Sequence, residues 1–372
     1  MRVLIYAPAA RMGGARAHVL GLLPELAAIA PDDDVLLVAQ PDLLAELPPL
    51  PSNWSVRPER AEARGFVGRL IWEQRGLPHL AEAWRADVLL SFGAFVPLRL
   101  PCPSVLEAGN ALYFTRAYWH ALEREPLRLR VEERARWKVL RASLRAAERI
   151  LTPTRAMRTD VVTRLPSLGP KVDVALWGVA PIFHNLRWQP PAGDAILGVS
   201  KHSINKEFDV LIAALPFVRR RWPAVQLLLT GTADESRWSR RSVVLARRLG
   251  VLDRVCFTGD VPNARIPELI RQSRVLVFPT WCESFGLPLA EALAMGAPAI
   301  AADIPACREV GGDAAGYYAT GDSHSMADRI GELLASPDDA DDVSERARER
   351  GRVFQWRDNA LGVHATLRRA AA

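Results

Sequence analysis

The sequence predicts an α/β protein built from two domains of parallel strands and covering helices. Short apolar runs rich in β-branched residues, such as residues 2–6, 34–39 and 275–278, indicate buried parallel strands. Longer stretches with helical periodicity separate these runs, as expected for repeated strand–helix–strand units. The chain has 372 residues and 49% of them are apolar, which is enough for two domains that each have a core.

In the first half, a strand at residues 2–6 leads into a helix that begins near Gly14. Pro24 lies inside this helix and is expected to kink it or split it. Residues 41–60 are rich in proline and polar groups, and they predict only a short helix at residues 43–47. A longer helix is expected at residues 67–84. Further strands are expected at residues 34–39, 87–91, 103–107, 149–154 and 172–176.

Residues 115–149 form a long helical region rich in arginine and glutamate, and they include Tyr118, Trp119 and Trp137. Two interpretations stay open. The first is a solvated helical hairpin with ion pairs along its exposed faces. The second is a surface that contacts an anionic bilayer, with tryptophan and arginine at the interface.

A linker-like stretch rich in proline places the boundary between the two domains near residues 178–192. The second half repeats the alternation of the first. Strands are expected at residues 195–200, 225–231, 254–261, 275–278 and 298–302. Helices are expected at residues 208–219, 266–272, 288–295 and 325–335, with a last helix that ends near residue 369.

Residues 279–298 contain the main group of candidate ligand-binding residues in the chain. This stretch follows the strand at residues 275–278, so its polar loop lies at the carboxyl end of a parallel strand, where open α/β sheets bind ligands. Gly286 permits a close approach of the backbone to a ligand, and Pro288 suits the first position of the next helix. The free N–H groups of the first helical turn, around Leu289 and Ala290, would receive phosphate oxygens.

Two glutamates accompany this phosphate cradle. Glu283 lies in the loop, and Glu291 is expected in the first turn of the helix. Ionised carboxylates only accept hydrogen bonds, so two of them beside a phosphate site suit two sets of sugar hydroxyls. The alternative is that Glu291 only complements the helix dipole and that Glu283 is solvated.

The pattern Glu-x7-Glu, with Phe-Gly-Leu-Pro between the glutamates and Glu-Ala-Leu-Ala-Met-Gly-x-Pro after them, resembles a known signature. It is similar to that of the retaining, nucleotide-sugar-dependent glycosyltransferases of family 4 (group 1), which have the GT-B fold. The resemblance covers nearly the whole chain and is strongest from residue 195 to 318. It implies that Glu283 contacts hydroxyls of the donor sugar and that Glu291 holds the ribose. Backbone groups at Phe285, Gly286 and Leu287 would contact the diphosphate.

The resemblance also implies a domain arrangement. Residues 1–180 would form a Rossmann-like, acceptor-binding domain, and residues 181–350 a Rossmann-like domain that binds the nucleotide sugar. The two domains would face each other across a cleft. Residues 351–372 would form a C-terminal helix that crosses back to the first domain.

Basic and glycine residues complete the expected donor site. Lys201 follows the strand at residues 195–200, and Lys206 precedes the helix at residues 208–219. A pair of cations there suits a diphosphate, although two surface lysines are the alternative. The resemblance supports both lysines as catalytic groups that stabilise the departing diphosphate. It also matches Gly13 and Gly14 to paired glycines that face the donor phosphates and the acceptor.

At one position the sequence departs from the family pattern. Many members have a histidine at the end of the strand that corresponds to residues 103–107, close to the reacting sugar. Here Glu107 or Asn110 lies near that position, and the register stays open. Glu107 is either a nucleophile or base, or a strand-end carboxylate that only forms hydrogen bonds. In relatives the base stacks near the end of the strand at residues 254–261, which makes Phe257 and Val261 candidate base contacts.

Charge and cysteine usage restrict the class of protein. The net charge of +6 favours phosphate-bearing partners or an anionic membrane surface, and no nucleic-acid recognition module is visible.

Cys102, Cys256, Cys282 and Cys307 lack disulfide-rich or zinc-site spacing, which favours reduced thiols in the cytoplasm. No apolar run approaches the roughly 20 residues of a membrane span. We expect no metal, because lysines and helix ends would replace Mg²⁺.

The sequence therefore predicts a retaining glycosyltransferase that moves a sugar from a UDP- or GDP-linked donor to a hydroxyl acceptor, with no further cofactor. A saccharide, a lipid-linked saccharide or a natural product would serve as acceptor. Bacterial cell-surface polysaccharide or glycolipid synthesis is the expected setting, in the cytoplasm, with peripheral membrane contact left open. The alternatives are a GT-B sugar-nucleotide epimerase or phosphorylase, and a catalytically degenerate nucleotide-binding subunit. A dinucleotide dehydrogenase is not favoured, since no GxGxxG follows a strand.

Overall fold

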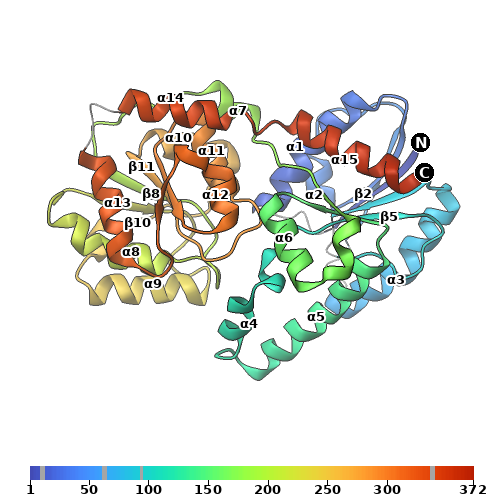
Figure 1. The fold of residues 1–372 in the computed structure, drawn as a ribbon, viewed down its shortest axis with the longest axis horizontal. Helices are drawn as coiled ribbons and strands as arrows, with labels where there is room; N and C mark the ends of the chain where they lie inside the picture. The colour runs from blue at the N-terminus through green and yellow to red at the C-terminus, as the bar shows by residue number, and fades with distance from the viewer. Residues whose placement is uncertain (9–12, 61–64, 93–94, 336–339) are drawn as a thin grey trace. The chain divides into compact units, whose positions relative to one another are not determined.

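The structure, a computed structural model, describes residues 1–8, 13–60, 65–92, 95–335 and 340–372. The chain divides into two compact units (Figure 1). Unit 1 consists of Met1–Gly178 together with Gln355–Ala372, and unit 2 is Val179–Phe354. Each unit has its own sheet and its own hydrophobic core.

Unit 1 is built on a seven-stranded sheet of order β3-β2-β1-β4-β5-β6-β7, in which all neighbours are parallel. Leu4 and Ile5 of the central strand β1 are fully buried. Because both faces of the central strands are buried, their sequences are continuous apolar runs. The strands are β1 (Arg2–Ala7), β2 (Asp34–Ala39), β3 (Trp54–Pro58), β4 (Val88–Ser91), β5 (Ser104–Glu107), β6 (Arg149–Thr152) and β7 (Val172–Val174).

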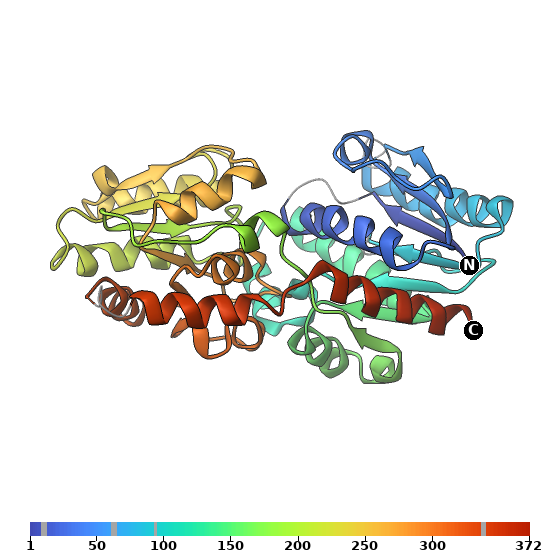
Figure 2. The same cartoon turned by 90° about the horizontal axis from the view of Figure 1, so that it is seen from above.

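Two helices from opposite ends of the chain pack side by side in unit 1 (Figure 2). Helix α15 contributes Val363 and Leu367 to the same core that receives Leu22 and Leu23 of α1. The chain terminus is therefore part of the core of unit 1. The helices of this unit are α1 (Gly13–Ile29), α2 (Pro41–Leu44), α3 (Gly65–Trp84), α4 (Arg116–Leu122), α5 (Leu127–Ala146), α6 (Arg155–Arg164) and α15 (Trp356–Ala371).

Unit 2 is built on a six-stranded parallel sheet of order β10-β9-β8-β11-β12-β13. Its strands are β8 (Ala195–Gly198), β9 (Gln226–Leu229), β10 (Val255–Phe257), β11 (Val275–Phe278), β12 (Ala299–Ala302) and β13 (Gly316–Tyr318). Its helices are α7 (Pro181–Asn185), α8 (Phe208–Arg219), α9 (Arg237–Arg248), α10 (Ile266–Arg271), α11 (Leu287–Met295), α12 (Pro305–Gly311), α13 (Ser323–Ala335) and α14 (Ala340–Gly351). The predicted α/β class with two parallel sheets is confirmed.

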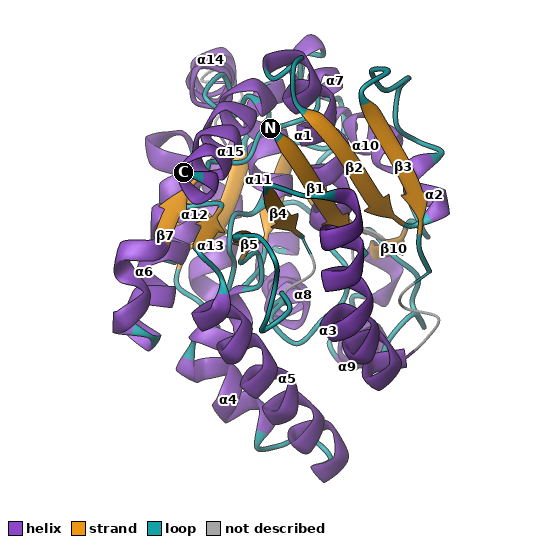
Figure 3. Ribbon diagram, turned by 90° about the vertical axis from the view of Figure 1, so that its right-hand side faces the viewer, coloured by secondary structure: helices purple, strands orange, loops and turns teal. Residues whose placement is uncertain are grey.

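Strand β3 lies inside residues 41–60, where the sequence predicted only a short helix. It pairs with β2 alone, at the edge of the sheet (Figure 3). Only Trp54 of its five residues is buried, so β3 has no apolar run that would reveal it. An edge strand also tolerates the proline at its end, Pro58, because one side of the strand needs no partner.

Helix α1 was expected to kink or split at Pro24. It spans Gly13–Ile29 with Pro24 inside it, so the proline does not divide the helix. Leu22, Leu23 and Leu26 are buried in the core of unit 1. The packing of this apolar face therefore outweighs the one backbone hydrogen bond that the proline removes.

Helix α14 packs against α11 in unit 2. A Cβ on Gly351, the last residue of α14, would lie 2.4 Å from Ala294 Cα and 2.6 Å from Ala294 N. The two backbones therefore approach each other more closely than any side chain permits. Helix α11 directly follows the residues 279–286 in which the sequence concentrates its site, so this contact fixes the helix beside the site.

We predict that Gly351→Ala lowers the stability of unit 2 by about 2 kcal/mol or more, because the two helices must separate to admit the methyl group. Urea unfolding followed by circular dichroism measures the change. Gly193→Ala is the matched control, since a Cβ there meets no atom within 4 Å, and it should shift stability by less than about 0.5 kcal/mol. Equal unfolding midpoints for the two variants would contradict the close packing.

Candidate functional site

The candidate site of unit 2 lies where the strand order reverses. From the central strand β8 the chain proceeds to β9 and β10 on one side, and it then returns to place β11 on the other side. Loops after β8 and after β11 therefore diverge, and open α/β sheets bind ligands in the crevice between them. Lys201 and Lys206 follow β8, and Glu283 follows β11. Three predicted residues thus reach the same edge of the sheet.

The two loops are joined by backbone hydrogen bonds. Lys206 and Thr280 form an isolated antiparallel bridge. Glu207 N donates to Pro279 O at 3.0 Å, and Trp281 N donates to Asn205 O at 3.0 Å. We refer to residues 205–207 and 279–281 as the loop bridge. It holds together two segments that are more than 70 residues apart in the chain.

Lys206 and Glu283 form an ion pair directly beside the loop bridge. Their side chains are only 10% and 15% exposed, so the pair is largely removed from water. Lys206 Nζ also lies 4.4 Å from the centre of the Phe278 ring. The Asn205 amide and the Thr280 hydroxyl each lie 3.4 Å from Glu283 Oε1. The sequence predicted both charged residues for the site, but it did not predict that they pair.

Glu207 and Tyr318 are site-supporting residues that sequence reasoning missed. The Tyr318 hydroxyl donates to Glu207 Oε2 at 2.6 Å, and it accepts a hydrogen bond from Thr280 N at 3.1 Å. Burial raises the pKa of the Glu207 carboxyl, and the hydrogen bond from Tyr318 partly opposes this shift. The loop bridge is therefore anchored to β13. No sequence signal marks the contact, because its partners are 111 positions apart.

One prediction about the N-terminus of α11 is wrong, namely that the amides of Leu289 and Ala290 are free for a phosphate. Leu289 N and Ala290 N donate to Gly286 O at 3.0 and 3.2 Å, so these amides are not free for a phosphate. Within the described part of the chain, the N–H groups of Gly286 and Leu287 donate to no acceptor. Gly286 has φ +99°, and a Cβ there would lie 3.0 Å from the Phe278 ring. Phe285 has a fully buried side chain that packs edge-on against Phe354, so only its backbone can face a ligand.

Glu291 lies in the second turn of α11, since Leu287 is the first helical residue, and the expectation of a first-turn position was wrong. The residue is 8% exposed. Its side chain makes no hydrogen bond or ion pair with any residue that the structure describes. Burial raises the pKa of the Glu291 carboxyl to about 8. A largely buried carboxyl without a protein partner costs stability unless it holds a proton or accepts hydrogen bonds from water or from a ligand.

Two further candidates of unit 2 lie around the ends of neighbouring strands. Lys201 is exposed and lies three residues after the end of β8, at Gly198. Val261 is half-buried in the loop after β10. That loop is tied to the loop after β9, because Gly231 N donates to Gly259 O at 2.9 Å and Gly259 N donates to Gly231 O at 3.1 Å. Both residues thus lie at the carboxyl edge of the sheet.

Gly13 and Gly14 belong to unit 1, where they begin α1 after the carboxyl end of β1. Residues 9–12 of the same loop are outside the described residues. A Cβ on Gly14 would lie 3.6 Å from the Trp177 ring. The switch point of this sheet is between β1 and β4, so the two glycines begin α1 at its edge.

Glu107, the strand-end carboxylate of β5, belongs to a buried network in unit 1. His18 Nδ1 lies 2.8 Å from Glu107 Oε1, and Trp177 Nε1 donates to the same oxygen at 3.0 Å. His18 Nε2 lies 3.2 Å from Asn359 Oδ1 on α15. Glu107 thus joins α1, β5 and the C-terminal helix, which supports the interpretation that it only forms hydrogen bonds. Asn110 caps the turn after β5 by accepting from Leu112 N at 3.1 Å.

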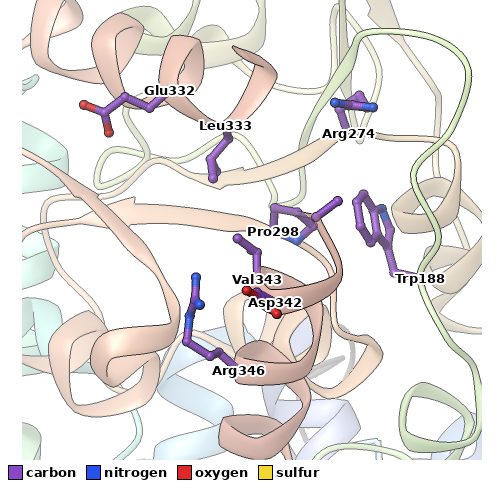
Figure 4. Close-up of a pocket in the computed structure, with 9 residues that line it drawn as sticks. Trp188, Arg274, Pro298, Glu332, Leu333, Asp342, Val343 and Arg346 are labelled. Carbon is purple, nitrogen blue, oxygen red and sulfur yellow. The ribbon is translucent and has the colours of Figure 1, made fainter. Parts of the chain in front are cut away.

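A separate pocket of about 350 Å³ lies elsewhere in unit 2 (Figure 4). Arg274 and Pro298, which line it, directly precede β11 and β12. The pocket is therefore at the amino-terminal edge of the sheet, opposite the candidate site. None of the predicted site residues lines it.

The described part of the chain also lacks a metal cluster and a membrane-spanning helix. No group of three or more His, Cys, Asp or Glu side chains in that part of the chain has an arrangement that would hold a metal ion. Among the helices described, none has the length and apolar character needed to cross a bilayer.

The fold is an open α/β type, and its candidate site lies at the switch point of the unit 2 sheet. Residues 194–336 match the family model "Glycosyl transferases group 1". O-antigen chain mannosyltransferase B of Escherichia coli is 26% identical over 265 residues, which cover 70% of this chain and 60% of that protein. The chain spans between 41% and 60% of the length of the first three curated relatives that it matches.

Solved structures establish the fold over the whole chain. Sucrose-phosphate synthase of Thermosynechococcus elongatus superposes with a TM-score of 0.77 at 17% identity, and the match covers 99% of this chain and 98% of that chain. The Anabaena protein Alr3699/HepE in complex with UDP-glucose gives a TM-score of 0.75 at 18% identity, with 99% and 100% coverage. The chain therefore has the GT-B glycosyltransferase fold.

The burial of Glu291 predicts a pH dependence of stability. Its pKa rises from 4.5 to about 8 on folding, so between these values the folded protein keeps a proton that the unfolded chain releases. The free energy of unfolding therefore falls as the pH rises through this window. Glu291→Gln removes the effect, and we expect the variant to exceed wild type at pH 8 by roughly 2 to 4 kcal/mol.

Urea unfolding of both proteins at pH 5, 6.5 and 8 measures this dependence. Glu349→Gln, which changes an exposed glutamate of the same unit, is the control and should keep the wild-type slope. If wild type and Glu291→Gln lose stability in parallel over this range, Glu291 is not the buried acid that the structure indicates.

Proposed function

We propose that the protein is a retaining glycosyltransferase that moves a sugar from a nucleoside-diphosphate sugar to a hydroxyl acceptor. One observation carries this proposal. At the switch point of unit 2, a lysine–glutamate pair lies on the same sheet edge as an unpartnered, buried carboxyl and two amides at the start of a helix. These groups together match a cation site for phosphate and two acceptor sites for sugar hydroxyls.

Each residue has a role that follows from its chemistry. Lys206, assisted by Lys201, binds the diphosphate and stabilises the charge that develops when the sugar–phosphate bond breaks. The N–H groups of Gly286 and Leu287 add a helix N-terminus to the same phosphates. Glu291 accepts hydrogen bonds from the ribose, and Glu283 accepts them from the transferred sugar. Lysines and helix amides thereby perform the task of a metal ion.

The donor and acceptor classes rest on similarity. Alr3699/HepE has been crystallised with UDP-glucose, and the Escherichia coli relative is named as an O-antigen mannosyltransferase. We therefore propose a UDP- or GDP-linked donor and an acceptor in polysaccharide or glycolipid synthesis.

Val261 lies in the loop that would border the base. Gly13 and Gly14 of unit 1 would contribute backbone groups toward phosphate and acceptor. In a retaining reaction, a phosphate oxygen of the departing donor would take the proton of the acceptor hydroxyl.

The exposed face of α5 supports peripheral contact with an anionic membrane on its cytoplasmic side. Leu127 and Val131 are 67% and 57% exposed, one helical turn apart. Arg128 and Arg134 are also exposed on this helix. Aliphatic side chains with neighbouring cations suit an interface between lipid chains and anionic headgroups.

Nucleotide binding tests the proposal first. Either UDP or GDP, but not NAD, should raise the thermal unfolding midpoint by several degrees, since a ligand at 100 times its dissociation constant adds about 2.7 kcal/mol. Glu291→Ala should lose most of this shift because it removes the ribose acceptor. An Ala variant that keeps the full shift would refute the ribose role, and no shift with any nucleoside diphosphate would contradict the donor class.

Measurement of turnover tests the proposed role of Lys206 at the diphosphate. Lys206→Ala should lower the release of nucleoside diphosphate from the nucleotide sugar by about 100-fold or more, because one group that stabilises transition-state charge is worth about that factor. Hydrolysis of the donor by water provides the assay before an acceptor is known. Lys138→Ala, an exposed lysine on α5, is the control and should keep wild-type turnover in solution. Wild-type turnover by Lys206→Ala would exclude its diphosphate role.

A further inference from the structure

The ion pair between Lys206 and Glu283 joins two groups that the proposed function assigns to different parts of the donor. Lys206 is assigned to the diphosphate, and Glu283 is assigned to the sugar. In the structure each satisfies the other, and both side chains are largely buried. A phosphate that binds Lys206 therefore competes with Glu283 for the ammonium group.

The neighbours of the pair keep both partners in place. Lys206 is held at its backbone by the bridge to Thr280, and its ammonium group lies over the Phe278 ring. Asn205 Nδ2 donates to Cys282 O at 2.8 Å, which fixes the residue before Glu283. Because both backbones are anchored, the carboxylate remains within reach of the lysine whenever the lysine is released. The pair can thus open and close by side-chain motion alone.

The two nucleotide species differ in how they compensate for opening the pair. A nucleotide sugar supplies phosphate oxygens to Lys206 and hydroxyl donors to Glu283, so both charges regain partners. A nucleoside diphosphate supplies only the phosphates. It leaves the Glu283 carboxylate, which is only 15% exposed, without its cation. Leaving a buried charge unpaired is costly.

We propose that the Lys206–Glu283 pair discriminates the sugar-bearing donor from the spent nucleoside diphosphate. The inference rests on the proposed function and assigns a further role to the same site. After transfer the sugar no longer holds Glu283, the carboxylate recaptures Lys206, and the affinity for the nucleoside diphosphate falls. Glu283 is therefore a specificity determinant that favours product release and limits product inhibition.

Calorimetric titration of the full chain with UDP and with GDP tests this role. Glu283→Gln keeps the shape of the side chain but removes the charge that competes for Lys206. We expect the variant to bind the nucleoside diphosphate roughly tenfold more tightly, the factor that corresponds to one hydrogen bond to a charged group. A gain in affinity is diagnostic, since structural damage to the site would lower it.

The Lys206→Ala background separates ion pairing from general charge repulsion. There, Glu283→Gln should change the dissociation constant by less than about twofold, because no lysine remains to be released. Asp253→Asn, which removes an acidic partner of the half-buried Arg219, is the charge-matched control and should leave the affinity at the wild-type value.

Two results would overturn the discrimination role alone: an unchanged or weaker affinity in Glu283→Gln, or the same tightening in both backgrounds. A failure of the proposed function itself would give different binding results. It would appear as nucleoside-diphosphate binding by Lys206→Ala that equals wild type, or as no binding by wild type and all variants.

Discussion

The loop bridge between residues 205–207 and 279–281 is the contact on which the candidate site depends. The loops after β8 and β11 leave the sheet in diverging directions, because the chain reverses its strand order between them. Backbone hydrogen bonds from Glu207 N and Trp281 N close this gap. The hydrogen bond from Tyr318 to the buried Glu207 carboxylate ties the bridge to β13. Only with these contacts do a lysine and a glutamate 77 positions apart become an ion pair.

The fold was predictable from the sequence wherever a strand is buried on both faces. Such strands, β1 and β11 for example, are continuous apolar runs, because helices or core residues cover both sides. β3 escaped prediction for the same physical reason, since four of its five residues are exposed and the strand carries no apolar run. At Pro24 the split that the sequence allowed does not occur, because the burial of Leu22, Leu23 and Leu26 outweighs the hydrogen bond that the proline removes.

The candidate site was predictable in its residues but not in their interactions. The spacing of Glu283 and Glu291 is local, so a sequence pattern carries it, and so does the left-handed Gly286 that begins α11. The Lys206–Glu283 pair and the Glu207–Tyr318 contact depend on how distant segments meet, which no spacing records. The exact residue at which α11 begins could not be predicted from the sequence pattern either. A shift of the first helical residue to Leu287 moved Glu291 into the second turn and engaged Leu289 and Ala290 in the helix.

The buried carboxylates of the chain differ in one respect that bears on function. Glu283 is compensated by Lys206, Glu207 by Tyr318, and Glu107 by His18 and Trp177. Glu291 is also buried, yet it has no such partner among the residues that the structure describes. Folding alone would favour an apolar residue at this position, because an uncompensated carboxyl lowers stability. Its presence at the edge where α11 begins is therefore best explained by a partner from outside the chain. In the proposed function, the adjacent hydroxyls of the donor's ribose would supply the donors that this carboxyl lacks.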